Sequence, residues 1–181
     1  MTVYMTENRT RSSYVRKMVY ASLFAALTAV GAWISIPLPH VPITLQTLFT
    51  MLSGAMLGPY FGALAMIVYV LMGLIGLPVF ANGTSGLGML LGPAGGYLIG
   101  FIVGAVIIGL LVRMKKKPGF LWLCLAMAIG EFVVLAFGTA WLFISTGGSV
   151  ETAIAAGFLP FVPGDILKIA VAALIARKIE V

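Results

Sequence analysis

The chain has 181 residues, of which 61% are apolar and 9% are charged, and its formal net charge is +6. An ordinary soluble domain carries about 25% charged residues. Eleven basic and five acidic side chains are too few to cover a soluble globule, so the composition excludes a soluble enzyme, a nucleic-acid-binding domain and a disordered chain. It indicates a polytopic protein of the lipid bilayer. The single cysteine, Cys124, excludes a disulfide framework or a cysteine-based metal cage.

Six apolar runs approach the length of about 20 residues that a membrane-spanning helix needs. We therefore expect an all-α fold, with residues 1–181 forming one membrane domain of six transmembrane helices behind a basic N-terminal segment at 1–17. Pro59 and Pro93 suit the first turn of a helix, and Leu57-Gly58-Pro59 predicts a tight turn. The runs cover residues 18–36, 42–57, 59–76, 93–113, 120–144 and 160–176.

The basic residues near the predicted spans form three clusters. With six spans all three clusters lie on one side of the membrane, and the positive-inside rule makes that side cytoplasmic. The sequence thus predicts a multi-pass protein of the cell membrane with both termini in the cytoplasm. The longer connections on the outer side contain no Lys or Arg. The clusters are Arg9, Arg11, Arg16 and Lys17 before the first run, Arg113, Lys115, Lys116 and Lys117 after the fourth, and Arg177 and Lys178 after the sixth.

Small residues recur every four positions on two of the predicted helices. Such stripes let helix backbones approach closely in lipid. The glycine stripe of the fourth run, Gly92, Gly96, Gly100 and Gly104, is expected to pack within the bundle. The alanine stripe of the first run, Ala21, Ala25 and Ala29, either packs within the bundle or meets a partner subunit.

The first outer connection, residues 37–44, is rich in proline and leads to Gln46 and Thr47. These two polar residues at the start of the second helix either cap it or line a pocket. His40 is expected to be a loop histidine. Trp33, near the outer end of the first helix, belongs either to an aromatic belt at the membrane surface or to a pocket wall.

The second outer connection, residues 77–92, reads LPVFANGTSGLGMLLG and is apolar yet rich in glycine. Asn82, Thr84 and Ser85 are its polar side chains. Non-helical backbone at membrane depth is tolerated only where it is buried in protein or lines a cavity. We expect a re-entrant-like segment that dips into the bundle, either as part of a ligand pocket or as a packing loop.

Three charges, Glu131, Asp165 and Lys168, lie within predicted spans. Ionisable groups there are costly and are candidates for function. Asp165 and Lys168 are three positions apart and therefore share a helix face, where they form either a self-satisfying ion pair or part of a binding site. Glu131 is expected near mid-membrane, in a packing or pairing role.

Motifs for hydrolytic or redox chemistry are absent from the sequence: it has no H-E-x-x-H, no second histidine and no G-x-S-x-G elbow. We expect no enzymatic activity, although a proton-abstracting enzyme that uses Asp165 and Glu131 stays open. A few polar groups in an apolar wall are typical of a small-molecule site. Because no nucleotide-binding motif occurs, ATP-driven transport would need partner subunits.

Three separated segments carry a resemblance to a known family. PHVPITLQTL (39–48), GLPVFANGTSGLGMLLGPAGGYLIGF (76–101) and PFVPGDILK (160–168) resemble BioY, the biotin-specific substrate-binding subunits of energy-coupling factor transporters. The resemblance implies high-affinity capture and uptake of biotin without a cofactor. A transmembrane coupling subunit and two ATP-binding-cassette ATPases would supply the energy. The alternative is a self-sufficient secondary carrier for biotin or another small vitamin.

The same resemblance assigns roles to site residues. It implies that Asp165, Asn82 and Lys168 bind the ureido ring of biotin, and that Phe80 and Trp33 contribute apolar walls. Some family members place a basic residue in or near the glycine-rich segment, whereas this chain has no cation between Asn82 and Tyr97. Lys168, Thr84, Ser85 and Tyr97 are therefore candidates for binding the ligand's carboxylate. Gln46 and Gly83 are further candidate site residues. The stripe of Ala21, Ala25 and Ala29 resembles the family's contact surface for the coupling subunit.

Overall fold

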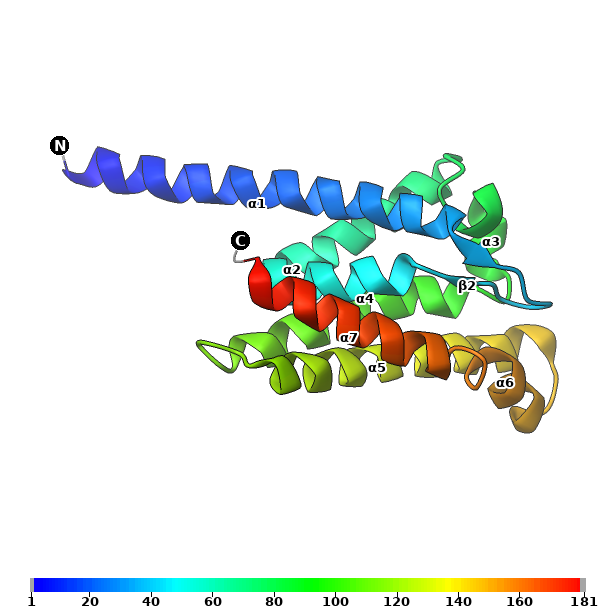
Figure 1. Cartoon of the computed structure of the whole chain (residues 1–181). Helices are drawn as coiled ribbons and strands as arrows, with labels where there is room; N and C mark the ends of the chain where they lie inside the picture. The colour runs from blue at the N-terminus through cyan, green and yellow to red at the C-terminus, as the bar shows by residue number, and fades with distance from the viewer. Residues whose placement is uncertain (1, 180–181) are drawn as a thin grey trace.

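A computed structural model describes residues 2–179 of the chain, and the side chains of residues 13–179. Apart from one short antiparallel strand pair, its regular elements are helices, and the long ones run side by side (Figure 1). In chain order they are α1 (Thr2–Trp33), β1 (Ser35–Ile36), β2 (Ile43–Thr44), α2 (Gln46–Leu74), the 3-10 helix η1 (Ala81–Gly83), α3 (Leu87–Leu91), α4 (Gly95–Arg113), α5 (Phe120–Thr146), α6 (Val150–Gly157) and α7 (Val162–Lys178).

Helix α2 is broken at Gly58, and its two arms, residues 46–57 and 59–74, lie antiparallel. Gly58 has a φ of 81°, which glycine adopts without steric cost. The Thr50 hydroxyl lies 3.2 Å from the Met66 sulfur, whereas 16 positions of a continuous helix would separate them by about 24 Å. The tight turn predicted at residues 57–59 is therefore confirmed.

The helices pack in the order α1, α2, α4, α5, and α7 lies against both α2 and α5. Glycines of α4 make the contact with α5 close: a Cβ at Gly100 would lie 3.0 Å from the backbone of Val134, and Gly96 faces Phe137 and Trp141. The glycine stripe thus packs within the bundle, as predicted, because only a missing side chain permits this approach.

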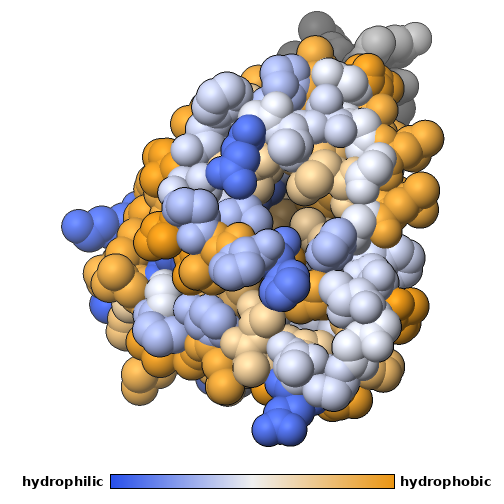
Figure 2. Space-filling model, turned by 90° about the vertical axis from the view of Figure 1, so that its right-hand side faces the viewer, coloured by the Kyte–Doolittle hydropathy of each residue, from blue (hydrophilic) through white to orange (hydrophobic). Residues whose placement is uncertain are grey.

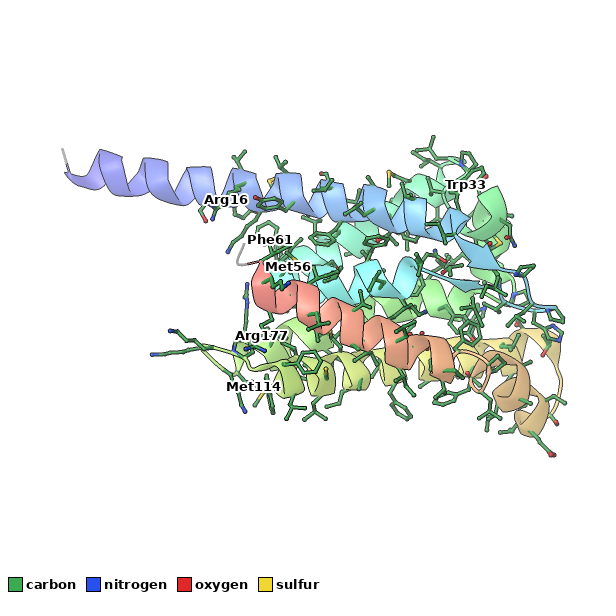
Figure 3. All side chains as sticks on the ribbon, in the orientation of Figure 1. Arg16, Trp33, Met56, Phe61, Met114 and Arg177 are labelled. Carbon is green, nitrogen blue, oxygen red and sulfur yellow. The ribbon has the colours of Figure 1, made fainter. Side chains whose placement is uncertain are left out.

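Apart from Lys168, the described Lys and Arg side chains gather at one end of the bundle, which we call the basic end. Arg16, Met114 and Arg177 lie there, while Trp33 lies at the opposite end (Figure 3). The Arg113 guanidinium donates a hydrogen bond to the Leu57 carbonyl oxygen at 3.3 Å, next to the turn of α2. Arg9 and Arg11 lie outside the described side chains. The opposite end, formed by the strand pair, residues 77–94 and α6, is called the loop end.

By length and composition, four helices among residues 2–179 are able to cross a membrane. They cover Ser13–Trp33, Gln46–Leu74, Gly95–Arg113 and Phe120–Thr146. Helices α6 and α7, bent by 45° at the break between them, make a fifth span if they are counted together. The expectation of six spans is thus matched only at the level of an all-helical membrane protein.

Several boundaries differ from the sequence-based expectations. Helix α1 begins at Thr2, inside the expected N-terminal segment, and ends at Trp33 rather than Ile36. Ser35 and Ile36 instead pair with Thr44 and Ile43, because the prolines between the two pairs prevent a helix and favour a turn. Helix α7 starts at Val162 rather than Pro160.

The connection between the fifth and sixth expected spans contains a helix, α6, that was not predicted from the sequence. Helix α6 begins with a capping box in which Ser149 and Thr152 each bond the other's backbone N–H at 3.1 Å. These two bonds give hydrogen-bond acceptors to two backbone N–H groups at the start of the helix, where no carbonyl of the helix can reach them. Eight residues are too short for a span, which is why hydropathy alone did not reveal this element.

Candidate ligand-binding site

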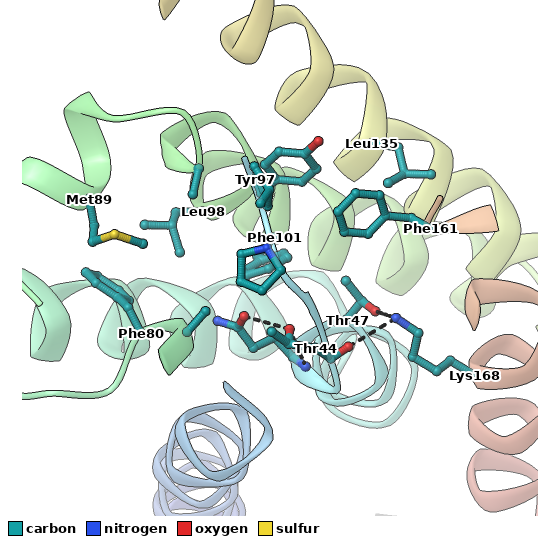
Figure 4. Close-up of a pocket in the computed structure, with 15 residues that line it drawn as sticks. Thr44, Thr47, Phe80, Met89, Tyr97, Leu98, Phe101, Leu135, Phe161 and Lys168 are labelled. Atoms are coloured by element: carbon teal, nitrogen blue, oxygen red, sulfur yellow. Dashed lines mark hydrogen bonds between the residues drawn. The ribbon is translucent and has the colours of Figure 1, made fainter. Parts of the chain in front are cut away.

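A cavity opens at the loop end between α2, α4, α5 and α7, and we call it the inner cavity (Figure 4). Its polar side chains are few: Thr44, Gln46 and Thr47 from one stretch of chain, and Lys168 from α7. Apolar and aromatic groups form the rest of the wall. They belong to Val41, Pro42, Phe80, Ala81, Met89, Ala94, Tyr97, Leu98, Phe101, Leu135 and Phe161.

Lys168 is buried, with 7% of its surface exposed, and its ammonium group is fully engaged. Nζ donates to the Thr47 hydroxyl at 2.7 Å and to the Thr44 carbonyl oxygen at 3.2 Å, and it lies 2.6 Å from Oδ1 of Asp165. An ammonium has three donors, so each has one partner. The ion pair confirms that Asp165 and Lys168 share a face of α7.

A second polar chain ties the start of α2 to the glycine-rich connection. The Thr44 hydroxyl donates to Oε1 of Gln46 at 2.7 Å, and the Gln46 amide donates to the Tyr69 hydroxyl. Tyr69 in turn donates to the Val79 carbonyl oxygen at 3.1 Å. These bonds hold the two arms of α2, strand β2 and the segment before η1 in one arrangement, which pre-orients the polar corner of the cavity.

Aromatic rings close the apolar side. Phe80 is fully buried and meets Tyr69 edge to face, with ring centroids 5.7 Å apart. Tyr97 stacks on Phe161 at the same centroid distance, and its hydroxyl donates to the Gly157 carbonyl oxygen at 2.5 Å. The Tyr97 ring therefore serves as wall, while its hydroxyl anchors α6.

A second cavity, which we call the vestibule, lies beside the inner cavity and shares Pro42, Ala81, Met89 and Ala94 with it. The loop end is visibly hollowed in the space-filling view (Figure 2). The remaining residues of the vestibule come from the turn after β1 and from the glycine-rich connection: Leu38, Pro39, His40, Asn82, Thr84, Gly88, Gly92 and Pro93.

A third cavity, between α5 and α7, contains the other two buried charges. Glu131 and Asp165 both line it, together with apolar groups such as Phe132 and Ile166. Glu131 is 2% exposed, and neither of its carboxylate oxygens has a hydrogen-bond partner among the described residues. Lys168 pairs with Asp165 rather than with Glu131.

The structure separates the sequence-predicted site residues into groups. Gln46, Phe80, Tyr97 and Lys168 line the inner cavity. Asn82 and Thr84 line the vestibule. Asp165 reaches the inner cavity only through its ion pair with Lys168, so Asn82 and Asp165 do not line a common cavity.

Three other candidates lie outside both cavities. Trp33 is 64% exposed, and its ring lies beside Gly83, where an added Cβ would come within 3.2 Å of it. Ser85 is exposed, and neither Ser85 nor Gly83 lines the inner cavity or the vestibule. Asn82 has a positive φ of 58° and accepts a hydrogen bond from the Ser35 hydroxyl at 2.9 Å.

The alanine stripe of α1 is not an exposed surface. Ala21 and Ala25 are 2% and 1% exposed and belong to the core, and Ala29 is partly buried against it. Ala21 and Ala25 are therefore not free to contact a partner, because they pack in the core of this chain, whereas a partner contact by Ala29 stays a prediction. The neighbouring small residues Ser22 and Ala26 are exposed instead.

Sequence reasoning did not assign Thr44, Phe101, Leu135 or Phe161 to the site. Thr44 carried a usable signal, since it is polar within the segment PHVPIT and its partner Gln46 had been singled out. The other three are apolar residues within apolar runs, and only the packing of α4, α5 and α7 brings them to the cavity.

Comparisons with known proteins agree with the family that the motifs resemble. A family model described as BioY family matches residues 5–181. A "Biotin transporter BioY" from Thermotoga maritima is 48% identical over 166 residues, covering 92% of this chain and 96% of that protein. A "Probable biotin transporter BioY" from Pyrococcus horikoshii is 38% identical, covering 91% and 96%. The crystal structure of an S-component for biotin from an ECF-type ABC transporter matches with a TM-score of 0.85 and 27% identity, covering 92% of both chains.

Proposed function

Because this chain belongs to the BioY family, we propose that it binds biotin in the membrane and mediates its uptake as the S-component of an ECF-type transporter. The observation that carries this proposal is the inner cavity, in which Lys168, Thr44, Thr47 and Gln46 form one polar corner of an otherwise apolar and aromatic pocket. Sparse, fixed polar groups in an apolar wall are how small-molecule sites obtain specificity.

The ureido ring of biotin fits the polar corner. It offers two N–H donors and one carbonyl acceptor. The Thr47 hydroxyl can donate to that carbonyl, and the Lys168 ammonium can do so by exchanging one of its present partners. The oxygens of Thr44 and Gln46, which line the inner cavity, are acceptors for the N–H groups, and Asp165, 2.6 Å from the Lys168 ammonium, holds that group in place. The sulfur-containing ring then lies against aromatic groups such as Phe80 and Phe161.

We propose six membrane spans, counting the two arms of α2 separately and α6 with α7 as one. The first arm, residues 46–57, is about 18 Å long, shorter than the hydrocarbon core of about 30 Å. The irregular chain before it, which includes Thr44, is held by the protein through the bonds of Gln46 and Lys168. Non-helical backbone is tolerated at membrane depth under that condition. The polar corner of the cavity would then lie below the membrane surface.

We propose that the basic end faces the cytoplasm. We also propose that the coupling subunit contacts the exposed face of α1. Ser22 and Ala26 are small, four positions apart and exposed, and they are flanked by Leu23 and Val30, which are 50% and 58% exposed. A partner helix can approach closely along such a stripe. Energy would come from ATP hydrolysis in partner subunits, because this chain has no nucleotide-binding motif.

Calorimetric titration of the purified, detergent-solubilised protein tests the proposal. Biotin is expected to bind, whereas thiamine and riboflavin are not. Uptake of labelled biotin by cells is expected to require the coupling subunit and the ATPases. Uptake at the same rate without these partners would favour the self-sufficient carrier, and chemical turnover of biotin would contradict a binding subunit.

A further inference from the structure

We infer that His40 is the residue that recognises the carboxylate at the far end of the ligand, and that this contact makes binding pH-dependent. The inference rests on the proposed function, since it concerns the tail of a ligand whose ring occupies the inner cavity. The tail would extend into the vestibule, where His40 lies.

The distribution of charge leaves few groups able to meet an anionic tail. Residues 18–112 contain no Lys, Arg, Asp or Glu, and they supply both the turn after β1 and the glycine-rich connection. Lys168 is buried and lines the inner cavity, where we propose that it meets the ureido ring, and it does not line the vestibule. His40 is therefore the titratable group that lines the vestibule among the residues the structure describes there.

The geometry allows one ligand to reach both sites. The inner cavity and the vestibule share four residues, so the two spaces adjoin. His40 is four positions from Thr44, whose carbonyl oxygen contacts Lys168, so the Cα atoms of His40 and Thr44 are at most about 14 Å apart. An elongated ligand with a ring at one end and a carboxylate at the other matches this arrangement.

The surroundings of His40 favour its role as the contact for an anion. Asn82 and Thr84, which line the same space, are uncharged. Glu151, the acidic residue on α6, does not line the vestibule. Imidazole is the side chain that ordinarily changes charge between about pH 5 and 8, and its protonated form attracts a carboxylate more strongly than its neutral form does. Affinity for a ligand with an anionic tail should therefore fall as the pH rises through this range.

The test compares biotin with biotinamide, whose tail is uncharged, by calorimetry at about pH 5.5 and about pH 8. Wild-type protein should bind biotin about three- to fivefold more tightly at the lower pH, the range of an exposed ion pair, and should bind biotinamide equally at both. His40→Gln should remove the pH dependence for biotin. His40→Arg, which keeps a permanent charge, should also remove it, while binding biotin at high pH more tightly than wild type.

Three results would overturn the inference alone. The first is a pH dependence for biotin that persists unchanged in His40→Gln, and the second is an equal pH dependence for biotin and biotinamide. The third is a wild-type protein that binds biotin with no pH dependence. Failure of the wild type to bind biotin at any pH would instead overturn the proposed function, and this inference with it. Thr84→Ala, which alters the vestibule without changing its charge, serves as the matched control and should keep the wild-type pH profile.

Discussion

The ammonium group of Lys168 lies 2.7 Å from the hydroxyl of Thr47, and this bond joins α7 to the first arm of α2 across 121 positions of sequence. Both side chains are buried. The bond places a charged donor from the end of the chain beside polar groups from its beginning, in the corner of the inner cavity where we propose that the ureido ring binds.

Removal of Lys168 should abolish both the ion pair and the binding of biotin. In Lys168→Met, Asp165 keeps a buried charge without its partner, a change that typically costs about 3–5 kcal/mol of stability. The double variant Asp165→Asn/Lys168→Met should recover most of that stability but should still bind biotin at least tenfold more weakly than wild type, because an unpaired buried polar group costs about 1–3 kcal/mol. Thermal unfolding and calorimetry measure the two effects. Wild-type affinity in the double variant would remove this pair from the site.

Thr47→Val should weaken biotin binding and should also lower the free energy of unfolding, because it leaves one buried donor of Lys168 without a partner. The substitution keeps the shape of the side chain and removes one hydroxyl, which is bonded to Lys168. We expect a loss of about five- to twentyfold in affinity, since a hydrogen bond to a charged group is worth about 1.5–3 kcal/mol and part of it is regained by rearrangement. Thr47→Ser, which retains the hydroxyl, is the control and should bind within about twofold of wild type.

Asn82 has a positive φ of 58°, so substitutions there separate a backbone effect from a contact effect. Asn82→Gly should keep the backbone conformation, whereas Asn82→Ala should lower the free energy of unfolding by about 1 kcal/mol, because alanine lacks the short polar side chain that allows asparagine to adopt this region. Both lose the bond from Ser35. If Asn82 contacts the ligand across the vestibule, both variants bind biotin more weakly. Wild-type affinity in Asn82→Gly would assign to Asn82 a structural role alone.

Two adjacent alanines of α1 should respond oppositely to the same substitution. Ala26 is exposed and Ala25 is 1% exposed. Ala26→Trp should bind biotin like the wild type but fail to co-purify with the coupling subunit and the ATPases. Ala25→Trp should reduce the yield of folded protein, because the core cannot accept an indole without strain. Co-purification of Ala26→Trp at wild-type yield would contradict the contact proposed for this face.

Glu131→Met should raise the midpoint of thermal unfolding. Both carboxylate oxygens of Glu131 are buried and have no hydrogen-bond partner within residues 13–179, and a buried polar group without partners is costly. Methionine has a similar size and no such cost, and Glu131 does not line the inner cavity, so affinity for biotin should stay within about threefold. A lower midpoint, or a tenfold loss of affinity, would show that Glu131 contributes to the charge balance around Asp165 and Lys168.

Much of the fold follows from local properties of the chain. The long helices, the turn at Gly58 and the packing of the α4 glycine stripe were predicted because hydropathy, proline position and residue size act over short distances in sequence. The strand pair, α6 and the exact helix ends were missed, because these short elements depend on hydrogen bonds and caps that hydropathy does not report.

The candidate site was predicted less completely. The residue types were informative at Gln46, Phe80, Tyr97 and Lys168, and all four line the inner cavity. Ala21 and Ala25 were assigned to a surface but are buried, because a small-residue stripe looks the same whether it meets a helix of its own chain or of a partner. The roles of Asn82 and Asp165 at the ligand stay predictions.

The amino-acid sequence by itself determined that this is a helical membrane protein with its charges placed mainly at one end, because the cost of burying charge in lipid acts on each segment independently. It also identified the rare polar residues within apolar runs as candidates for function. Only the tertiary structure decided that Lys168 meets Thr44 and Thr47, that Asn82 and His40 share a vestibule beside them, and which face of α1 is free. Those relationships depend on the relative rotation and depth of packed helices, which no single segment specifies.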